Sequence, residues 1–213
     1  GELVIDKNVV LKFLGNAYNG VEMSRSKVTL AAGYTITDSF DGQVAIAQTN
    51  YQRTTPSAGD INDIVITNKG TINLTGKLAT GMAADYGLIN NGTTGILSIA
   101  GDNSVGILAA NGSIVTNDGT VNIDGDNSVG IYARNYFDGT TATSSGTLGY
   151  GDDSINIANN GTVEILPSSY SNSVYGIYLD NSGVVPASMS NLTLGANSEI
   201  IIGDNSSSSV NKN

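Results

Sequence analysis

Residues 119–133, GTVNIDGDNSVGIYA, repeat residues 95–109, GILSIAGDNSVGILA, in step and 24 residues apart. The same frame begins 25 residues earlier, at Gly70, and a fourth copy begins at Gly161. A fixed period of this length is the sequence signature of proteins built from stacked repeats. In such proteins each repeat buries its apolar residues only when neighbouring repeats stack on it.

Each copy contains short segments in which apolar and polar residues alternate. In one of them Val121 and Ile123 flank Asn122. A second segment follows the next glycine of the repeat, and a third precedes each Asn-x-Gly corner. Alternation with period two predicts half-buried strands, so each copy is expected to contain three strands joined by Gly and Asn turns.

Three strands per repeat describe one triangular coil of about 24 residues, and stacked coils place equivalent residues over one another. The sequence therefore predicts an all-β fold, a right-handed parallel β-helix with loop insertions. Helices are disfavoured, because 27 of the 213 residues are glycine and no long stretch has helical periodicity. One inward column is predicted to contain Ile72, Leu97, Val121 and Val163.

In three copies an asparagine lies two residues before the corner glycine, at Asn68, Asn117 and Asn159. Asparagine tolerates left-handed backbone geometry and forms local hydrogen bonds. These residues are expected to form either ordinary corner turns or a short ladder of stacked side chains. Because the second copy has Thr93 at this position, a ladder is expected to be interrupted there.

The repeat frame divides the chain into three parts. Residues 1–63 are less regular and are expected to form looser coils of the same solenoid or a small cap. Residues 64–206 are expected to form the regular coils, with a long insertion at 134–154. Residues 207–213 are the end of the segment or the start of a further coil, since the chain is expected to be part of a longer protein.

Apolar clusters in the first part predict strands at residues 9–11, 28–30 and 44–46. Residues 52–60, which contain threonine, proline and glycine, predict a surface loop.

The composition excludes several kinds of site. The chain has no cysteine, which excludes disulfides and thiolate metal sites, and no histidine, the commonest general base and zinc ligand. The net charge is −10, and residues 78–213 contain only two basic residues, Arg134 and Lys212. Because binding of phosphates needs clustered Lys and Arg, nucleic acid is not expected as a partner.

The insertions are the predicted binding site. The long one adds about 18 residues to the frame, and a smaller one of four residues lies around residues 166–170. Insertions in solenoids often form the binding face, and exposed tyrosines provide a large contact area. A loop without a partner is the alternative. The candidate binding residues are Tyr136, Phe137, Asp138, Tyr150, Asp152, Asp153 and Tyr170.

Acidic pairs are the candidates for catalysis, namely Asp124 with Asp126 and Asp152 with Asp153. Glycoside hydrolysis needs two carboxylates on either side of a substrate cleft, and nothing in the sequence predicts a cleft. Arg134 is the one basic residue near these pairs in the repeats. We therefore expect no enzymatic activity and no catalytic residues.

Calcium is a second possibility at the sequence Gly-Asp-Asn-Ser, which occurs at residues 101–104, 125–128 and 203–206. Asp and Asn oxygens suit calcium, but the Asp-rich nonapeptide that binds calcium in stacked turns is absent. The simpler interpretation is that these residues cap a corner, so neither a metal nor a cofactor is expected.

The repeat unit Asn-x-Gly-Thr-Val-Asn-Ile-x-Gly-Asp-Asn-Ser-Val-Gly-Ile-Tyr-Ala, at residues 117–133, resembles the passenger repeats of large type V autotransporters. It is most similar to those of fusobacterial outer-membrane adhesins. The resemblance covers residues 64–206 and is strongest over 70–133. It does not define binding residues, so none is carried over from the family.

The resemblance implies a passenger segment on the cell surface, secreted through the outer membrane by a C-terminal β-barrel outside these residues. It also implies adhesion to a protein or glycan on other bacteria or host cells, with this segment as scaffold or binding face. A polysaccharide-active β-helix enzyme and the stalk of a secreted toxin or protease are the alternatives.

Overall fold

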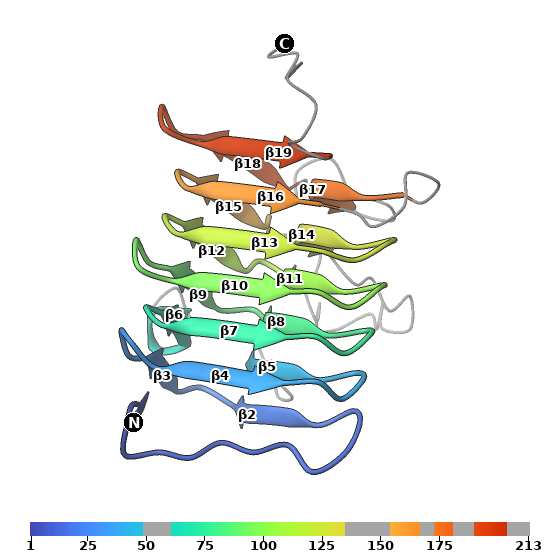
Figure 1. The fold of residues 1–213 in the computed structure, drawn as a ribbon. Coiled ribbons are helices and arrows are strands. Elements are labelled where there is room, and N and C mark those ends of the chain that lie inside the picture. The colour runs from blue at the N-terminus through green and yellow to red at the C-terminus, as the bar shows by residue number, and fades with distance from the viewer. Residues whose placement is uncertain (49–60, 135–153, 167–172, 181–189, 204–213) are drawn as a thin grey trace, which may run out of the picture.

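The computed structural model describes residues 1–48, 61–134, 154–166, 173–180 and 190–203. These residues form nineteen strands and one short 3-10 helix, η1 (Ile61–Asp63). All paired strands are parallel, and they form three sheets in which strands stack in chain order along a rod (Figure 1). This is the predicted right-handed parallel β-helix with three strands per coil.

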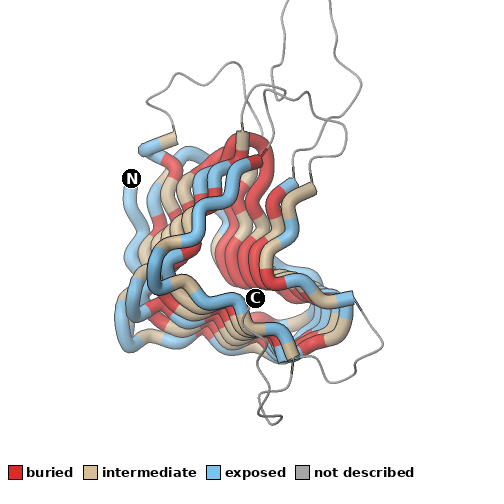
Figure 2. Tube along the Cα trace, turned by 90° about the horizontal axis from the view of Figure 1, so that it is seen from above, coloured by how far each residue is buried: buried red, intermediate tan, exposed pale blue. Residues whose placement is uncertain are grey.

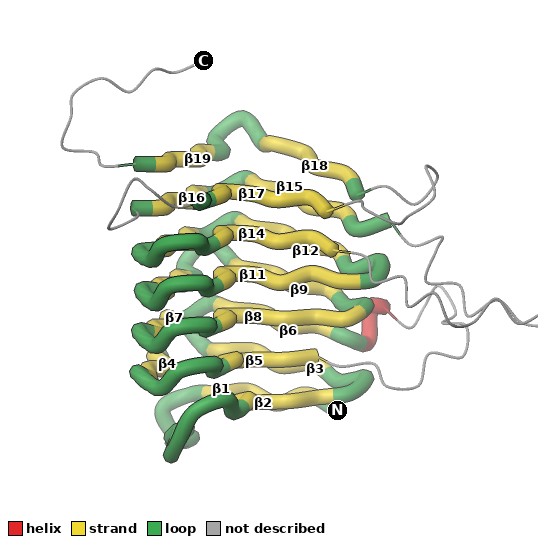
Figure 3. Tube along the Cα trace, turned by 90° about the vertical axis from the view of Figure 1, so that its right-hand side faces the viewer, coloured by secondary structure: helices red, strands yellow, loops and turns green. Residues whose placement is uncertain are grey.

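Each complete coil contributes one strand to each sheet (Figure 3). The first sheet contains β1 (Glu2–Ile5), β3 (Lys27–Leu30), β6 (Val65–Asn68), β9 (Leu88–Asn91), β12 (Ile114–Asn117), β15 (Asn156–Asn159) and β18 (Asn191–Leu194). The second sheet contains β4 (Thr35–Asp38), β7 (Thr71–Leu74), β10 (Ile96–Ile99), β13 (Thr120–Ile123), β16 (Thr162–Ile165) and β19 (Glu199–Ile202). The third sheet contains β2 (Asn19–Met23), β5 (Val44–Gln48), β8 (Thr80–Asp85), β11 (Val105–Ala110), β14 (Val129–Arg134) and β17 (Tyr175–Asp180).

The predicted inward column is confirmed by strand register. Ile72 pairs with Leu97, Leu97 with Val121, and Val121 with Val163, and all four side chains are fully buried. The three sheets form walls around one narrow interior (Figure 2). The alternating sequence therefore produces a continuous apolar core along the rod, because every second side chain of each strand points inward.

The asparagine ladder is continuous, and the predicted interruption at Thr93 is wrong. In each step the side-chain Nδ2 of one asparagine donates to Oδ1 of the asparagine in the next coil. The distances are 2.9 Å from Asn68 to Asn91, 2.8 Å from Asn91 to Asn117 and 2.6 Å from Asn117 to Asn159. All four side chains are fully buried. The corner after β9 is two residues longer than the corners after β6, β12 and β15, so Asn91 occupies the position that simple counting assigns to Thr93.

The N-terminal strands join the same three sheets as the later ones. The predicted strands at 28–30 and 44–46 correspond to β3 and β5, but residues 9–11 form no strand. Their apolar side chains still alternate, since Val9 and Leu11 pack on the core and Phe13 is buried, whereas Val10 and Leu14 are exposed. Residues 9–14 therefore cover the N-terminal end of the core without ladder pairing.

At the other end of the described rod, residues that continue the inward columns are accessible. Leu192 pairs with the buried Ile157 and Ile200 with the buried Val163, yet Leu192 and Ile200 are 38% and 40% exposed. The outermost coil has no further described coil above it.

Candidate binding surface

The predicted binding residues Tyr136, Phe137, Asp138, Tyr150, Asp152, Asp153 and Tyr170 all lie outside the described part of the chain. The structure does place the ends of the two insertions. β14 ends at Arg134 and β15 begins at Asn156, whereas the smaller insertion separates β16 from β17. Both insertions therefore connect strands and leave the stacking of the coils unchanged.

The long connections are concentrated at one corner of the rod. Residues 49–60, 135–153 and 181–189 each follow a strand of the third sheet, namely β5, β14 and β17, and precede a strand of the first sheet. The equivalent corner after β11 is short, as Asn111 and Gly112 make the turn with positive φ (47° and 77°). The third sheet is thus bordered by the variable corner of the solenoid.

Two columns of outward positions on β8, β11, β14 and β17 form an uncharged strip that we call the outer band. The outer band consists of Thr80, Ala83, Val105, Leu108, Val129, Tyr132, Tyr175 and Tyr178. Register aligns them in two columns, because Leu108 pairs with Tyr132 and Tyr132 with Tyr178. In the same coils the second sheet instead presents mostly Thr, Asn and Ser outward. The first sheet also presents apolar residues outward, at Val65, Leu88 and Ile114, but no aromatic ring. An apolar strip that includes exposed aromatic rings is typical of an interaction surface.

The aromatic residues of the described strands are all in the outer band. The rings of Tyr132 and Tyr178 stack with centroids 5.3 Å apart, and those of Tyr175 and Tyr178 with centroids 5.0 Å apart. These separations are typical of favourable ring pairs. Tyr175 and Tyr178 are 44% and 40% exposed, so the three stacked rings form an aromatic cluster that solvent can reach.

Two opposite charges lie beside the aromatic cluster. Arg134 and Asp180 are paired in register at the ends of β14 and β17, with Nε of Arg134 3.6 Å from Oδ2 of Asp180. The same carboxylate oxygen accepts a hydrogen bond from the hydroxyl of Tyr132 at 3.4 Å. The polar groups beside the rings therefore carry balanced charge, with their geometry set by the parallel pairing.

The Gly-Asp-Asn-Ser turns at residues 101–104 and 125–128 form a column at the corner between the second and third sheets. The backbone N–H of Asp126 donates to Asp102, and that of Ser104 donates to the hydroxyl of Ser128. The Lys77 ammonium, 3.0 Å from Asp102, lowers the pKa of that carboxyl through a hydrogen bond, and Asp102 in turn raises the pKa of Lys77. These side chains act as corner hydrogen-bonding groups.

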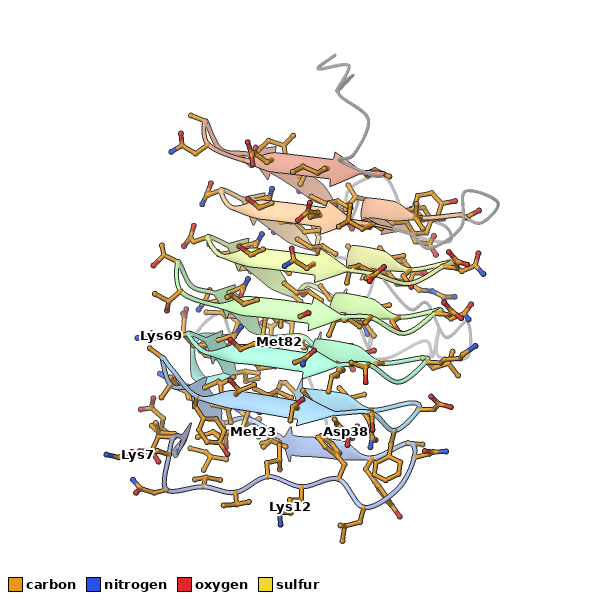
Figure 4. The ribbon with its side chains drawn as sticks, in the orientation of Figure 1. Lys7, Lys12, Met23, Asp38, Lys69 and Met82 are labelled. Carbon is orange, nitrogen blue, oxygen red and sulfur yellow. The ribbon has the colours of Figure 1, made fainter. Side chains whose placement is uncertain are left out.

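Positive side chains are concentrated toward the start of the rod. Lys7 and Lys12 lie at its N-terminal end (Figure 4), and seven of the nine basic residues precede residue 78. The later coils, which carry the aromatic cluster, are acidic. Their charge disfavours anionic partners.

The aromatic cluster was not among the predicted site residues. Its signal is present in the sequence, because Tyr132 and Tyr178 occupy the same place in the motif Gly-Ile-Tyr, at 130–132 and 176–178. This position points outward in the repeat, so the motif places the two rings in one column. Tyr175 replaces the Val129 of the preceding coil, and nothing in the repeat indicates that its ring joins the stack.

In the described part of the chain, no helix is long and apolar enough to cross a membrane. The same residues contain no group of three or more acidic side chains placed to hold a metal ion.

The family model of the BigA third pectate lyase-like domain matches residues 82–199, more than half of the chain. No curated protein and no solved structure matches the chain. The matched residues run from within β8 to the start of β19 and include the whole aromatic cluster. The chain therefore belongs to the family of the BigA third pectate lyase-like domain.

Proposed function

We propose that this chain is a surface-exposed, adhesin-type domain in which a rigid β-helix presents one binding face. The observation that carries the proposal is the outer band of the third sheet, where eight uncharged residues from four successive strands include three stacked tyrosines. Binding residues placed on paired strands keep their spacing. Strands β8, β11 and β14 pair on both sides, and β17 pairs with β14.

The finer assignment is that the domain is a passenger segment of a large type V autotransporter, similar to fusobacterial adhesins. The repeat at residues 117–133 supports this assignment, as does membership of the BigA domain family. A passenger segment works outside the cell, and an uninterrupted stack of short coils is suited to projecting a surface away from the membrane.

We further propose that the domain has no catalytic role, and that "pectate lyase-like" describes its fold. Fold alone does not determine function. Two of the cations that a polysaccharide-cleaving site could use are in ion pairs, Lys77 with Asp102 and Arg134 with Asp180. Release of reducing ends from neutral or acidic polysaccharides, lost in Asp124→Asn or Asp126→Asn, would overturn this proposal.

Binding of the labelled chain to epithelial cells and to bacteria tests the adhesin function. Saturable binding is expected, and unlabelled chain should compete with the labelled chain. A deletion of residues 135–153 shows whether the insertion contributes. Absence of saturable binding to any cell type would assign the segment a scaffold role only.

A further inference from the structure

We propose that Tyr132, Tyr175 and Tyr178, together with Asp180 and Arg134, form a binding site for a neutral pyranose sugar of a cell-surface glycan. The inference rests on the proposed adhesin function and names the ligand class of its binding face.

The aromatic cluster supplies the apolar half of such a site. One side of a pyranose ring presents several C–H groups, which are attracted to the electron-rich faces of aromatic rings. Tyr175 and Tyr178 are 44% and 40% exposed, and each already stacks on a neighbouring ring. Stacking restricts the rings before a ligand arrives, so binding costs little side-chain entropy.

Asp180 and Arg134 supply the polar half. A carboxylate accepts hydrogen bonds from two adjacent hydroxyls, and a guanidinium donates to hydroxyl oxygens. The Asp180 side chain is 16% exposed and that of Arg134 is 45% exposed, so both groups reach the surface beside the rings. A few fixed polar groups next to aromatic side chains are the usual composition of a small-molecule site.

The local charge selects a neutral ligand. Nε of Arg134 lies 3.6 Å from Oδ2 of Asp180, and the two charges balance each other. The site therefore offers no excess charge for an ionic ligand. Beyond Arg134 and Asp180, residues 78–213 hold eleven acidic residues and one basic residue, and this excess negative charge repels sialylated or sulfated glycans.

The size of the outer band favours a short saccharide over a second copy of the chain. Four strands at about 4.8 Å spacing and a width of about 10 Å give roughly 200 Å². A stable protein interface needs about 800 Å² from each partner. A few sugar rings fit the smaller area.

Saturation-transfer NMR on the whole chain tests the inference directly. Saturating tyrosine ring protons should transfer signal to the C–H protons of methyl glycosides of glucose, galactose or mannose. The same measurement with lactose and 3′-sialyllactose compares neutral with anionic sugar. We expect Tyr175→Ala and Tyr178→Ala to weaken binding about tenfold. Tyr178→Phe, which keeps the ring, should retain most of the transfer.

Tyr18→Ala is the matched control, since Tyr18 is 57% exposed and lies at the other end of the rod. Unfolding midpoints of all variants show whether an effect is structural. The inference is overturned if no neutral glycoside receives transfer, or if Tyr178→Ala binds as well as the parent chain. If cells still bind the chain while sugars do not, the glycan inference fails and the adhesin function stands. The partner is a protein if two results occur together: Tyr178→Ala abolishes binding to cells, and glycosidase treatment of the cells leaves binding of the parent chain intact.

Discussion

Asn91 donates a hydrogen bond from its side-chain amide to Asn117 at 2.8 Å, buried at the corner between the first and second sheets. The Asn91 amide oxygen accepts from Asn68 at the same time, so one side chain connects three coils. An amide that stacks in this way satisfies donors and acceptors that the narrow core would otherwise leave buried without partners.

Replacing Asn91 by alanine should therefore destabilise the chain by about 2 kcal/mol, since polar groups of Asn68 and Asn117 lose a buried partner. Asn90→Ala is the control, because Asn90 points outward from the same strand and is only half-buried. Urea unfolding, monitored by circular dichroism, measures the free energy of unfolding of both variants. Equal stability of the two variants would show that the ladder contributes nothing.

Leu78 has a left-handed backbone, with φ of 57°, at a corner where the next two coils have Asn103 and Asn127 at φ of 57° and 54°. Leucine is strained in this conformation, whereas asparagine tolerates it. Leu78 is 62% exposed, so little burial is lost on replacement. We expect Leu78→Asn to stabilise the chain by about 1 kcal/mol, and the reciprocal Asn103→Leu to destabilise it similarly. Thermal unfolding in which Leu78→Asn melts below the parent would refute this.

Gly101 allows neighbouring coils to approach closely at the corner between the second and third sheets. A Cβ atom there would lie 1.8 Å from the backbone oxygen of Gly76, and the backbone would have to move. Gly101→Ala should cost about 3 kcal/mol or more, as overpacking against backbone does. At Gly92 the nearest atom to an added Cβ is 3.4 Å away, so Gly92→Ala should be nearly neutral. Comparable losses of stability in Gly101→Ala and Gly92→Ala, measured by urea unfolding, would contradict the observed close packing.

The Asp102 carboxyl should titrate below its ordinary value of 3.8, because Lys77 and the backbone N–H of Asp126 favour its charged form. Its contribution to stability is present above that ordinary pKa and is lost as the pH falls through the lowered pKa. NMR titration of the carboxyl carbon measures the shift. Lys77→Gln should raise the midpoint toward 3.8, whereas Lys69→Gln should leave it unchanged. Since the pair is exposed, we expect little change in the unfolding midpoint at neutral pH.

The coil could be predicted from sequence because glycine and asparagine recur at fixed offsets and the strands alternate with period two. Corner length could not be predicted, because a turn can gain two residues without disturbing the strands on either side. For this reason Asn91 was not predicted as a member of the asparagine ladder. The outer band was missed for a different reason. Periodicity identifies which residues point inward, but contacts between outward residues such as Tyr132 and Tyr178 depend on which coils are neighbours after a long insertion.

The central claim is that one face of the rod binds the cell surface, and three substitutions in a single coil test it. Ser98, Leu108 and Thr116 are half-buried, outward residues of the second, third and first sheets, respectively. Binding isotherms to whole cells should show a loss of about tenfold or more for Leu108→Arg, because a charge then enters the outer band. Ser98→Arg and Thr116→Arg should bind like the parent chain. Unchanged binding of Leu108→Arg, or equal losses for all three, would contradict a binding face on the third sheet.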